Sequence, residues 1–223
     1  MVTPDARAFD GMAAVLRAPA SRDHNGMVVP LQSAVCIVPR PREFDHGTVV
    51  DAAMHAFWSG GLVATSVDDL LRSTGLSRSS MYQCIGNRDT LIELAVGRYV
   101  DQLIAAIDRL FAAMPFPRAL ETLLTDAALD NFGGRGCLLA NGLTELHAAE
   151  AAGIKVVRTG MSRLCEALGR VIASGCPRCT DPAQRCVEVM VAIVGLRTLQ
   201  RAGTRQTLLR GAARRFASEL TRD

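Results

Sequence analysis

Apolar residues recur at helical spacing along most of the chain after residue 44. Four of them, from Val50 to Phe57, fall on one face of a predicted helix over 46–59, which ends at Gly60 and Gly61. The same period predicts longer helices over 88–114, 120–132, 137–148, 151–173, 183–203 and 205–221. No stretch alternates apolar and polar residues for long enough to predict a strand. Together with two short helices, the pattern predicts an all-α fold of about nine helices.

The two short helices lie between the first helix and the long helix that begins near residue 88. Thr65 or Ser66 can cap the first of them, because each precedes an aspartate by three residues. Gly75 ends this helix, and Ser77 caps the second. Two short helices joined by a glycine turn are the pattern of a helix-turn-helix over 66–85, although such pairs also occur in ordinary helical bundles.

The second helix of a helix-turn-helix enters the major groove of DNA. The side chains predicted to be exposed on this helix are Arg78, Ser79, Ser80, Tyr82 and Gln83. Arginine can read guanine and glutamine can read adenine through paired hydrogen bonds, whereas a tyrosine hydroxyl suits a phosphate. Arg78 and Gln83 are therefore the predicted base-reading residues.

Further phosphate contacts are predicted at helix starts, where backbone N–H groups point outward. Thr65, Ser66 and Arg88 lie at such starts, and Arg40 with Arg42 forms a basic arm before the first helix. The net charge of the whole chain is only +3, and residues 39–90 hold five arginines against six acidic residues, a net charge of −1. DNA contacts must therefore be few and well placed.

Composition indicates a cytoplasmic protein with a buried core and no membrane partner. Apolar residues make up 49% of the chain and aromatic residues only 4%, which favours helices over sheets. No apolar run reaches the roughly 18 residues that a membrane span needs. Seven cysteines without framework spacing fit a reducing compartment. Residues 1–38 mix proline, glycine and isolated charges without a period and are predicted to be a flexible N-terminal extension.

Five segments between residues 40 and 91 carry a recognisable pattern. They are RPREFD at 40–45, AAMHAFW at 52–58, ATSVDDL at 64–70, GLSRSSMY at 75–82 and NRDTL at 87–91. In this order they resemble the N-terminal domain of TetR-family transcriptional regulators. The resemblance implies a three-helix DNA-binding domain over 39–90 and a larger helical ligand-binding and dimerisation domain over 91–223. It also implies a homodimer that binds near-palindromic double-stranded operator DNA, usually as a repressor released by a small molecule.

The resemblance carries over to single positions. Thr65 and Tyr82 match phosphate-contacting sites of the family, and Arg88 falls where the family usually has lysine or arginine. Cys84 and Ile85 depart from the pattern, because many members have an aromatic residue near the end of this helix. Later segments, RGCLLAN at 135–141 and GLRTL at 195–199, resemble segments of one branch. By analogy, the last two helices form the dimer interface.

A ligand pocket is expected inside the second domain, with an apolar lining and a few polar groups. The predicted lining residues are Phe111, Cys137, Asn141, Thr144 and His147. For each polar member, the alternative is an ordinary surface or core position.

Three cysteines suggest the main alternative to a regulator that responds to a small molecule. Cys176 and Cys179 form a CPRC motif, and Cys186 follows seven residues later. Thiolates at this spacing can bind a metal or form a redox disulfide, but a structural zinc site needs four ligands. The prediction is therefore no cofactor and no resident metal, with a redox- or metal-responsive regulator of the same fold as the alternative.

An enzyme finds little support in the sequence. The four histidines have no metal-ligand spacing, no glycine-rich phosphate loop follows a strand, and no catalytic residues are predicted. The alternative to a DNA-binding regulator is a helical interaction protein, or an enzyme, that does not bind DNA.

Overall fold

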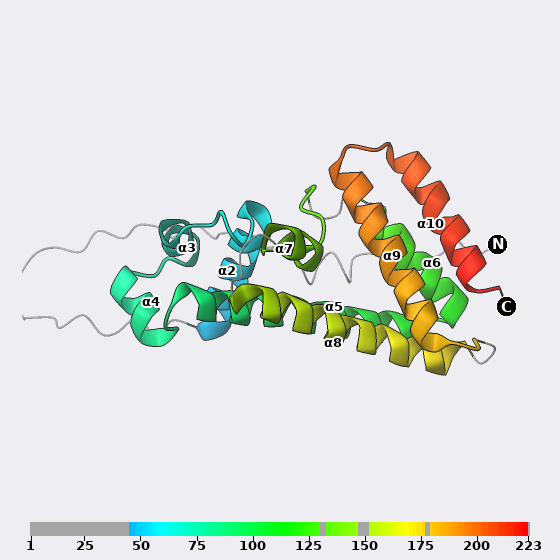
Figure 1. The fold of residues 1–223 in the computed structure, drawn as a ribbon, viewed down its shortest axis with the longest axis horizontal. Coiled ribbons are helices and arrows are strands. Elements are labelled where there is room, and N and C mark those ends of the chain that lie inside the picture. The colour runs from blue at the N-terminus through cyan, green and yellow to red at the C-terminus, as the bar shows by residue number, and fades with distance from the viewer. Residues whose placement is uncertain (1–44, 130–132, 147–151, 177–178, 223) are drawn as a thin grey trace, which may run out of the picture.

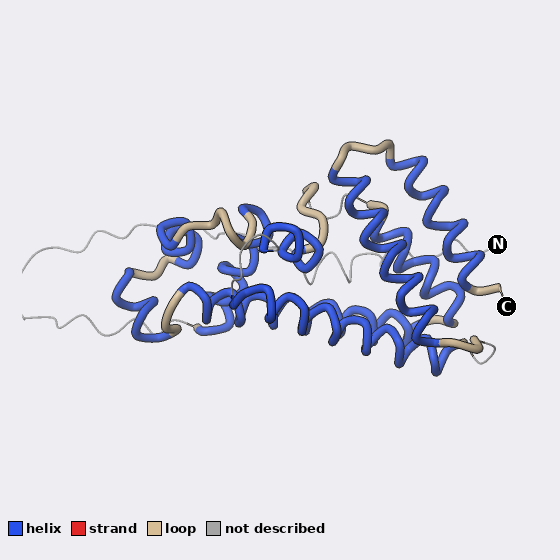
Figure 2. Tube along the Cα trace, in the orientation of Figure 1, coloured by secondary structure: helices blue, strands red, loops and turns tan. Residues whose placement is uncertain are grey.

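The structure is a computed structural model that describes residues 45–129, 133–146, 152–176 and 179–222. The predicted N-terminal extension over 1–38 lies outside the described residues, as do Arg40, Arg42 and His147. Every regular element in the described ranges is an α-helix (Figure 2), which confirms the predicted all-α fold.

The helices have the following bounds: α2 (His46–Gly60), α3 (Val67–Thr74), α4 (Arg78–Cys84), α5 (Arg88–Ala113), α6 (Phe116–Ala127), α7 (Leu138–Leu146), α8 (Ala152–Gly175), α9 (Pro182–Arg201) and α10 (Gln206–Leu220). None of these helices is long and apolar enough to cross a membrane.

The two longest helices, α5 and α8, lie side by side along the length of the molecule (Figure 1). Helices α2, α3 and α4 gather at one end of α5, whereas α6, α9 and α10 pack together at the other end. Helix α7 lies between these groups and packs mainly against α8. The predicted helix-turn-helix, α3 and α4, therefore lies at one end of a long helical body.

A continuous cluster of buried apolar side chains joins the two ends. Met54 and Phe57 of α2, Tyr99 of α5 and Leu120 of α6 are all fully buried within it. Burial of this apolar area is the main stabilising contribution to a helical fold of this kind. The predicted domain boundary at residue 90 falls in the first turn of α5, which continues unbroken to Ala113.

One helix begins earlier than the sequence pattern predicts. Pro115 and Pro117 indicate a turn, with the next helix starting at residue 120, but α6 begins at Phe116 and includes Pro117 in its first turn. Proline is tolerated there because the first N–H groups of a helix have no partner within the helix. Phe116 then packs its ring 5.7 Å from that of Phe111.

Candidate nucleic-acid interface and effector cavity

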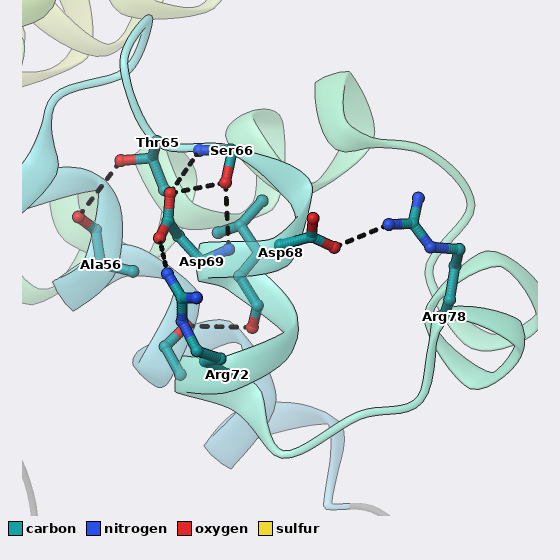
Figure 3. Close-up of polar contacts among 9 residues, drawn as sticks. Ala56, Thr65, Ser66, Asp68, Asp69, Arg72 and Arg78 are labelled. Carbon is teal, nitrogen blue, oxygen red and sulfur yellow. Dashed lines mark hydrogen bonds and ion pairs between the residues drawn. The ribbon is translucent and has the colours of Figure 1, made fainter.

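The start of α3 is closed by a reciprocal cap (Figure 3). The Ser66 hydroxyl accepts the Asp69 N–H at 3.2 Å, and the Asp69 carboxylate accepts the Ser66 N–H at 2.9 Å. Hydrogen bonds from Ser66 also hold the pKa of Asp69 below its usual value, and Arg72 pairs with the same carboxylate. The predicted cap is therefore present, and the Ser66 side chain is engaged in it.

The turn between α3 and α4 has the geometry of a helix-turn-helix. Gly75 adopts the left-handed region at φ 70°, and its N–H donates to the Leu71 carbonyl at 3.0 Å. An L side chain is strained in this conformation, which explains the glycine. Leu76 is buried beneath the turn, and the Ser77 hydroxyl caps α4 by accepting the Ser80 N–H at 3.1 Å.

Helix α4 is anchored on one face and open on the other. Met81 is fully buried, whereas Arg78, Ser79, Tyr82 and Gln83 are exposed. Half of the Tyr82 surface remains in contact with solvent, which is a large fraction for an aromatic side chain in a helix. The exposed set matches the predicted recognition face, with Ser80 half-buried beside it.

Arg78 has a partner on the neighbouring helix. Its Nη2 donates to Asp68 Oδ1 of α3 at 2.6 Å, and both side chains are more than half exposed (Figure 3). Exposed ion pairs of this kind contribute about 0–1 kcal/mol to stability. The guanidinium can therefore exchange this partner for another acceptor at low cost.

Two residues with predicted phosphate contacts make hydrogen bonds within the protein. Thr65 is buried, and its hydroxyl donates to the Gly61 carbonyl at 2.7 Å. Arg88 donates to the carbonyls of Leu62 and Val63, and its Nε donates to the Thr65 carbonyl at 3.1 Å. Both side chains hold the turn between α2 and α3, a positioning role that the sequence pattern did not predict.

A cavity of about 600 Å³ lies between α7, α8 and α9. Its lining includes three of the predicted ligand-pocket residues, Cys137, Asn141 and Thr144. Phe111 lies elsewhere, packed against Phe116. The structure thus brings three of the five predicted residues together, and His147 falls outside the described part of the chain.

The charged residues of this cavity could not be recognised from the apolar pattern of the sequence. Arg197 and Arg201 line it from α9, and Glu145 lines it from α7. Arg197 is almost fully buried, with 6% of its surface exposed. The available signal was the spacing of the two arginines, which lie four residues apart and therefore on one face of a helix.

The interior wall behind the cavity is apolar with a few polar groups. A smaller cavity there shares Cys137, Val194 and Arg197 with the first. The Tyr99 hydroxyl lies 3.8 Å from the Cys137 sulfur, and burial raises the pKa of Tyr99. Burial also raises the pKa of Asp126 to about 6, while the positive charge of Arg197 acts in the opposite direction.

The cavity wall is joined to the helix-turn-helix region at two points. The Gly136 carbonyl accepts hydrogen bonds from Trp58 Nε1 of α2 at 3.2 Å and from Arg197 Nη1 of α9 at 3.4 Å. Glu145 Oε2 accepts the backbone N–H of Val63, in the turn between α2 and α3, at 3.2 Å. These hydrogen bonds connect the cavity wall to α2 and to the turn that precedes α3.

The two cysteines of the CPRC motif and Cys186 have different hydrogen-bond partners. Cys176 and Cys179 are half-buried, and the Cys179 N–H donates to the Cys176 carbonyl at 3.0 Å. The Cys186 thiol donates to the Cys165 carbonyl at 3.1 Å, and burial with the neighbouring Cys165 raises its pKa to about 12. Among the residues that the structure describes, no group of three histidine, cysteine or acidic side chains could hold a metal ion.

The chain combines a helix-turn-helix at one end with a helical body that contains a cavity, an arrangement typical of helical DNA-binding proteins with a second domain. No family model matches the chain. It is 33% identical over 115 residues to the HTH-type transcriptional repressor ComR of Escherichia coli (strain K12), covering 48% of this chain and 53% of ComR. It is 30% identical over 110 residues to the uncharacterized HTH-type transcriptional regulator YezE of Bacillus subtilis (strain 168), covering 48% of this chain and 57% of YezE. The chain spans about half the length of the curated relatives it matches.

Solved structures resemble a larger part of the chain. A cysteine mutant of the TetR family transcriptional regulator CifR, complexed with 26-base-pair operator DNA, aligns with a TM-score of 0.64 at 24% identity, covering 80% of this chain and 98% of CifR. FadR of Bacillus subtilis, in complex with stearoyl-CoA, aligns with a TM-score of 0.59 at 12% identity. The alignment covers 78% of this chain and 96% of FadR. The chain has the fold of TetR-family transcriptional regulators, which confirms the predicted resemblance at the level of the fold.

Proposed function

We propose that this protein is a DNA-binding transcriptional regulator that reads an operator through the exposed face of α4. The observation that carries the proposal is the capped α3–turn–α4 unit with Arg78, Tyr82 and Gln83 on its open face. Arg78 and Gln83 are the proposed base readers, and Tyr82 is a proposed phosphate contact. Arg40 and Arg42 remain predicted contacts of the arm before α2.

The regulator is proposed to act as a homodimer. Helices α9 and α10 border a groove of about 480 Å³ with an almost wholly apolar lining. Val191, Leu199 and Phe216 line it, and each exposes between 45% and 67% of its surface. Exposed apolar patches of this kind mark protein interfaces, and a second copy with two-fold symmetry would present a second α4 to a palindromic operator.

Control by a small molecule is the finer part of the proposal. The cavity wall touches Trp58 and the turn at Val63, so a bound molecule that displaces Gly136 or Glu145 would move the helix-turn-helix. Release from the operator in response to such a molecule would make the protein a repressor, acting in the cytoplasm. No catalytic role is proposed.

Replacing Arg78 by alanine is expected to weaken operator binding by about tenfold to a hundredfold, the range of one bidentate base contact. The measurement is fluorescence anisotropy with duplex DNA that flanks the protein's own gene, since regulators of this kind often act on neighbouring genes. Asp68→Asn is the matched variant, because it removes the partner of Arg78 and leaves the arginine in place. We expect it to retain or increase the affinity, because it also removes a negative charge near the phosphates. Equal affinity of Arg78→Ala and the unmodified protein would contradict this assignment of α4.

A further inference from the structure

Three polar side chains converge on one point of the cavity wall. Gly136 is buried there at φ 69°, and its carbonyl accepts from Arg197 Nη1 at 3.4 Å. A Cβ atom placed on Gly136 would lie 3.4 Å from Asn141 Oδ1 and 3.7 Å from Arg201 Cδ. The absence of a side chain at this glycine therefore lets Asn141 and Arg201 approach the same small region of the wall as Arg197.

The charges in this region favour an anion. Arg197 and Arg201 contribute two positive charges, and the burial of Arg197 strengthens its interactions by excluding water. The opposing charges are Glu145, whose carboxylate accepts the Val63 N–H, and the buried Asp126, which interacts electrostatically with Arg197. Burial raises the pKa of Asp126 to about 6, so this carboxyl is still mostly ionised at neutral pH, but it does not line the cavity. Among the residues that line the cavity, two arginines against one glutamate leave a net charge of +1.

The uncharged polar groups are mainly hydrogen-bond acceptors. Asn141 Nδ2 donates to the Arg135 carbonyl at 2.8 Å, which fixes the amide and leaves Oδ1 as the acceptor near Gly136. The hydroxyls of Thr144 and Thr198 donate to carbonyls of their own helices, so their oxygens also remain available as acceptors. A ligand that matches this wall carries a donor, such as a hydroxyl, beside its anionic group.

On the basis of the proposed function, we propose that the cavity binds a small amphipathic carboxylate, preferably one with a hydroxyl group next to the carboxylate. The carboxylate would pair with Arg201 and Arg197, because a guanidinium fork matches the two oxygens. The hydroxyl would donate to Asn141 Oδ1, and an alkyl chain would lie against Leu143 and Met161. A volume of about 600 Å³ lies within the usual range for small-molecule sites.

The test is isothermal titration calorimetry on the full chain without DNA, with probes that share one alkyl chain. Decanoate, 2-hydroxydecanoate and decanol are each used below the concentration at which they aggregate. Decanoate is expected to bind at least about tenfold more tightly than decanol, which corresponds to about 1.4 kcal/mol, and 2-hydroxydecanoate more tightly still. Arg201→Gln is expected to remove the advantage of decanoate, and Asn141→Ala the advantage of the hydroxyl group. Arg158→Gln, an exposed arginine of α8 outside the cavity lining, is the control and should change neither.

Three results would overturn the inference. They are equal binding of decanoate and decanol, an equal effect of Arg201→Gln and Arg158→Gln, and no binding of any probe to the folded chain. Operator binding is measured on the same preparations, which separates the two proposals. A chain that binds the operator but not decanoate contradicts only the ligand class. A chain that binds decanoate but no operator contradicts only the proposed regulatory function.

Discussion

Replacing Arg88 by methionine is expected to lower the free energy of unfolding by about 3 kcal/mol. The guanidinium donates to three backbone carbonyls in the turn between α2 and α3 and lies 5.8 Å from the centre of the Phe57 ring. Hydrogen bonds to a charged group contribute about 1.5–3 kcal/mol each, and bonds that share one donor group are not additive. Denaturant unfolding measures the effect as a lower transition midpoint at an unchanged slope.

Two further variants make this prediction specific to the geometry of the guanidinium. Arg88→Lys is expected to recover only part of the stability, because an ammonium group lacks the planar fork that reaches several carbonyls. Arg109→Met removes an exposed arginine of the same helix and should change the free energy of unfolding by less than about 0.5 kcal/mol. Equal unfolding midpoints for Arg88→Met and Arg109→Met would show that Arg88 does not hold the turn.

Replacing Val191 by arginine is expected to convert a dimer into a monomer and to weaken operator binding at least about a hundredfold. Val191 exposes 67% of its surface in the apolar groove between α9 and α10. In a two-fold interface the substitution occurs twice, so each copy would bring a charge into an apolar contact. Loss of the second recognition helix then removes half of the DNA contacts and the gain in affinity from linking two half-sites.

Light scattering after size-exclusion chromatography measures the molecular mass, and anisotropy measures the DNA affinity. The control is Ala112→Arg, which adds the same charge at an exposed position of α5 outside the groove lining. It should leave both the mass and the affinity unchanged. A dimer that persists in Val191→Arg would place the subunit interface elsewhere.

The helix-turn-helix could be predicted because its signals are local in the sequence. Ser66, Gly75 and Ser77 each act on backbone groups within four residues, as the observed caps and turn confirm. The apolar period of the neighbouring helices depends on the same short range. The bounds of α2 and α5 therefore lie within one residue of their predicted ends.

The directions of single polar side chains could not be predicted in this way. Thr65 and Arg88 have residue types that suit a phosphate contact, yet their hydrogen bonds run to carbonyls inside the α2–α3 turn. Arg197 likewise resembles a surface residue in the sequence, and only the packing of α9 against its neighbours buries it. Such orientations depend on contacts between residues far apart in the chain, which one sequence does not reveal.

The most direct test of the central claim is a footprint of the unmodified protein on duplex DNA that flanks its own gene. A dimer that reads DNA through α4 should protect two major-groove patches related by two-fold symmetry, with centres one helical turn of about 34 Å, or a multiple of it, apart. Within each patch, methylation of guanine N7 should interfere with binding, because Arg78 is the proposed reader of that edge. Saturating binding without protection of the major groove, or a single protected patch without symmetry, would contradict the account.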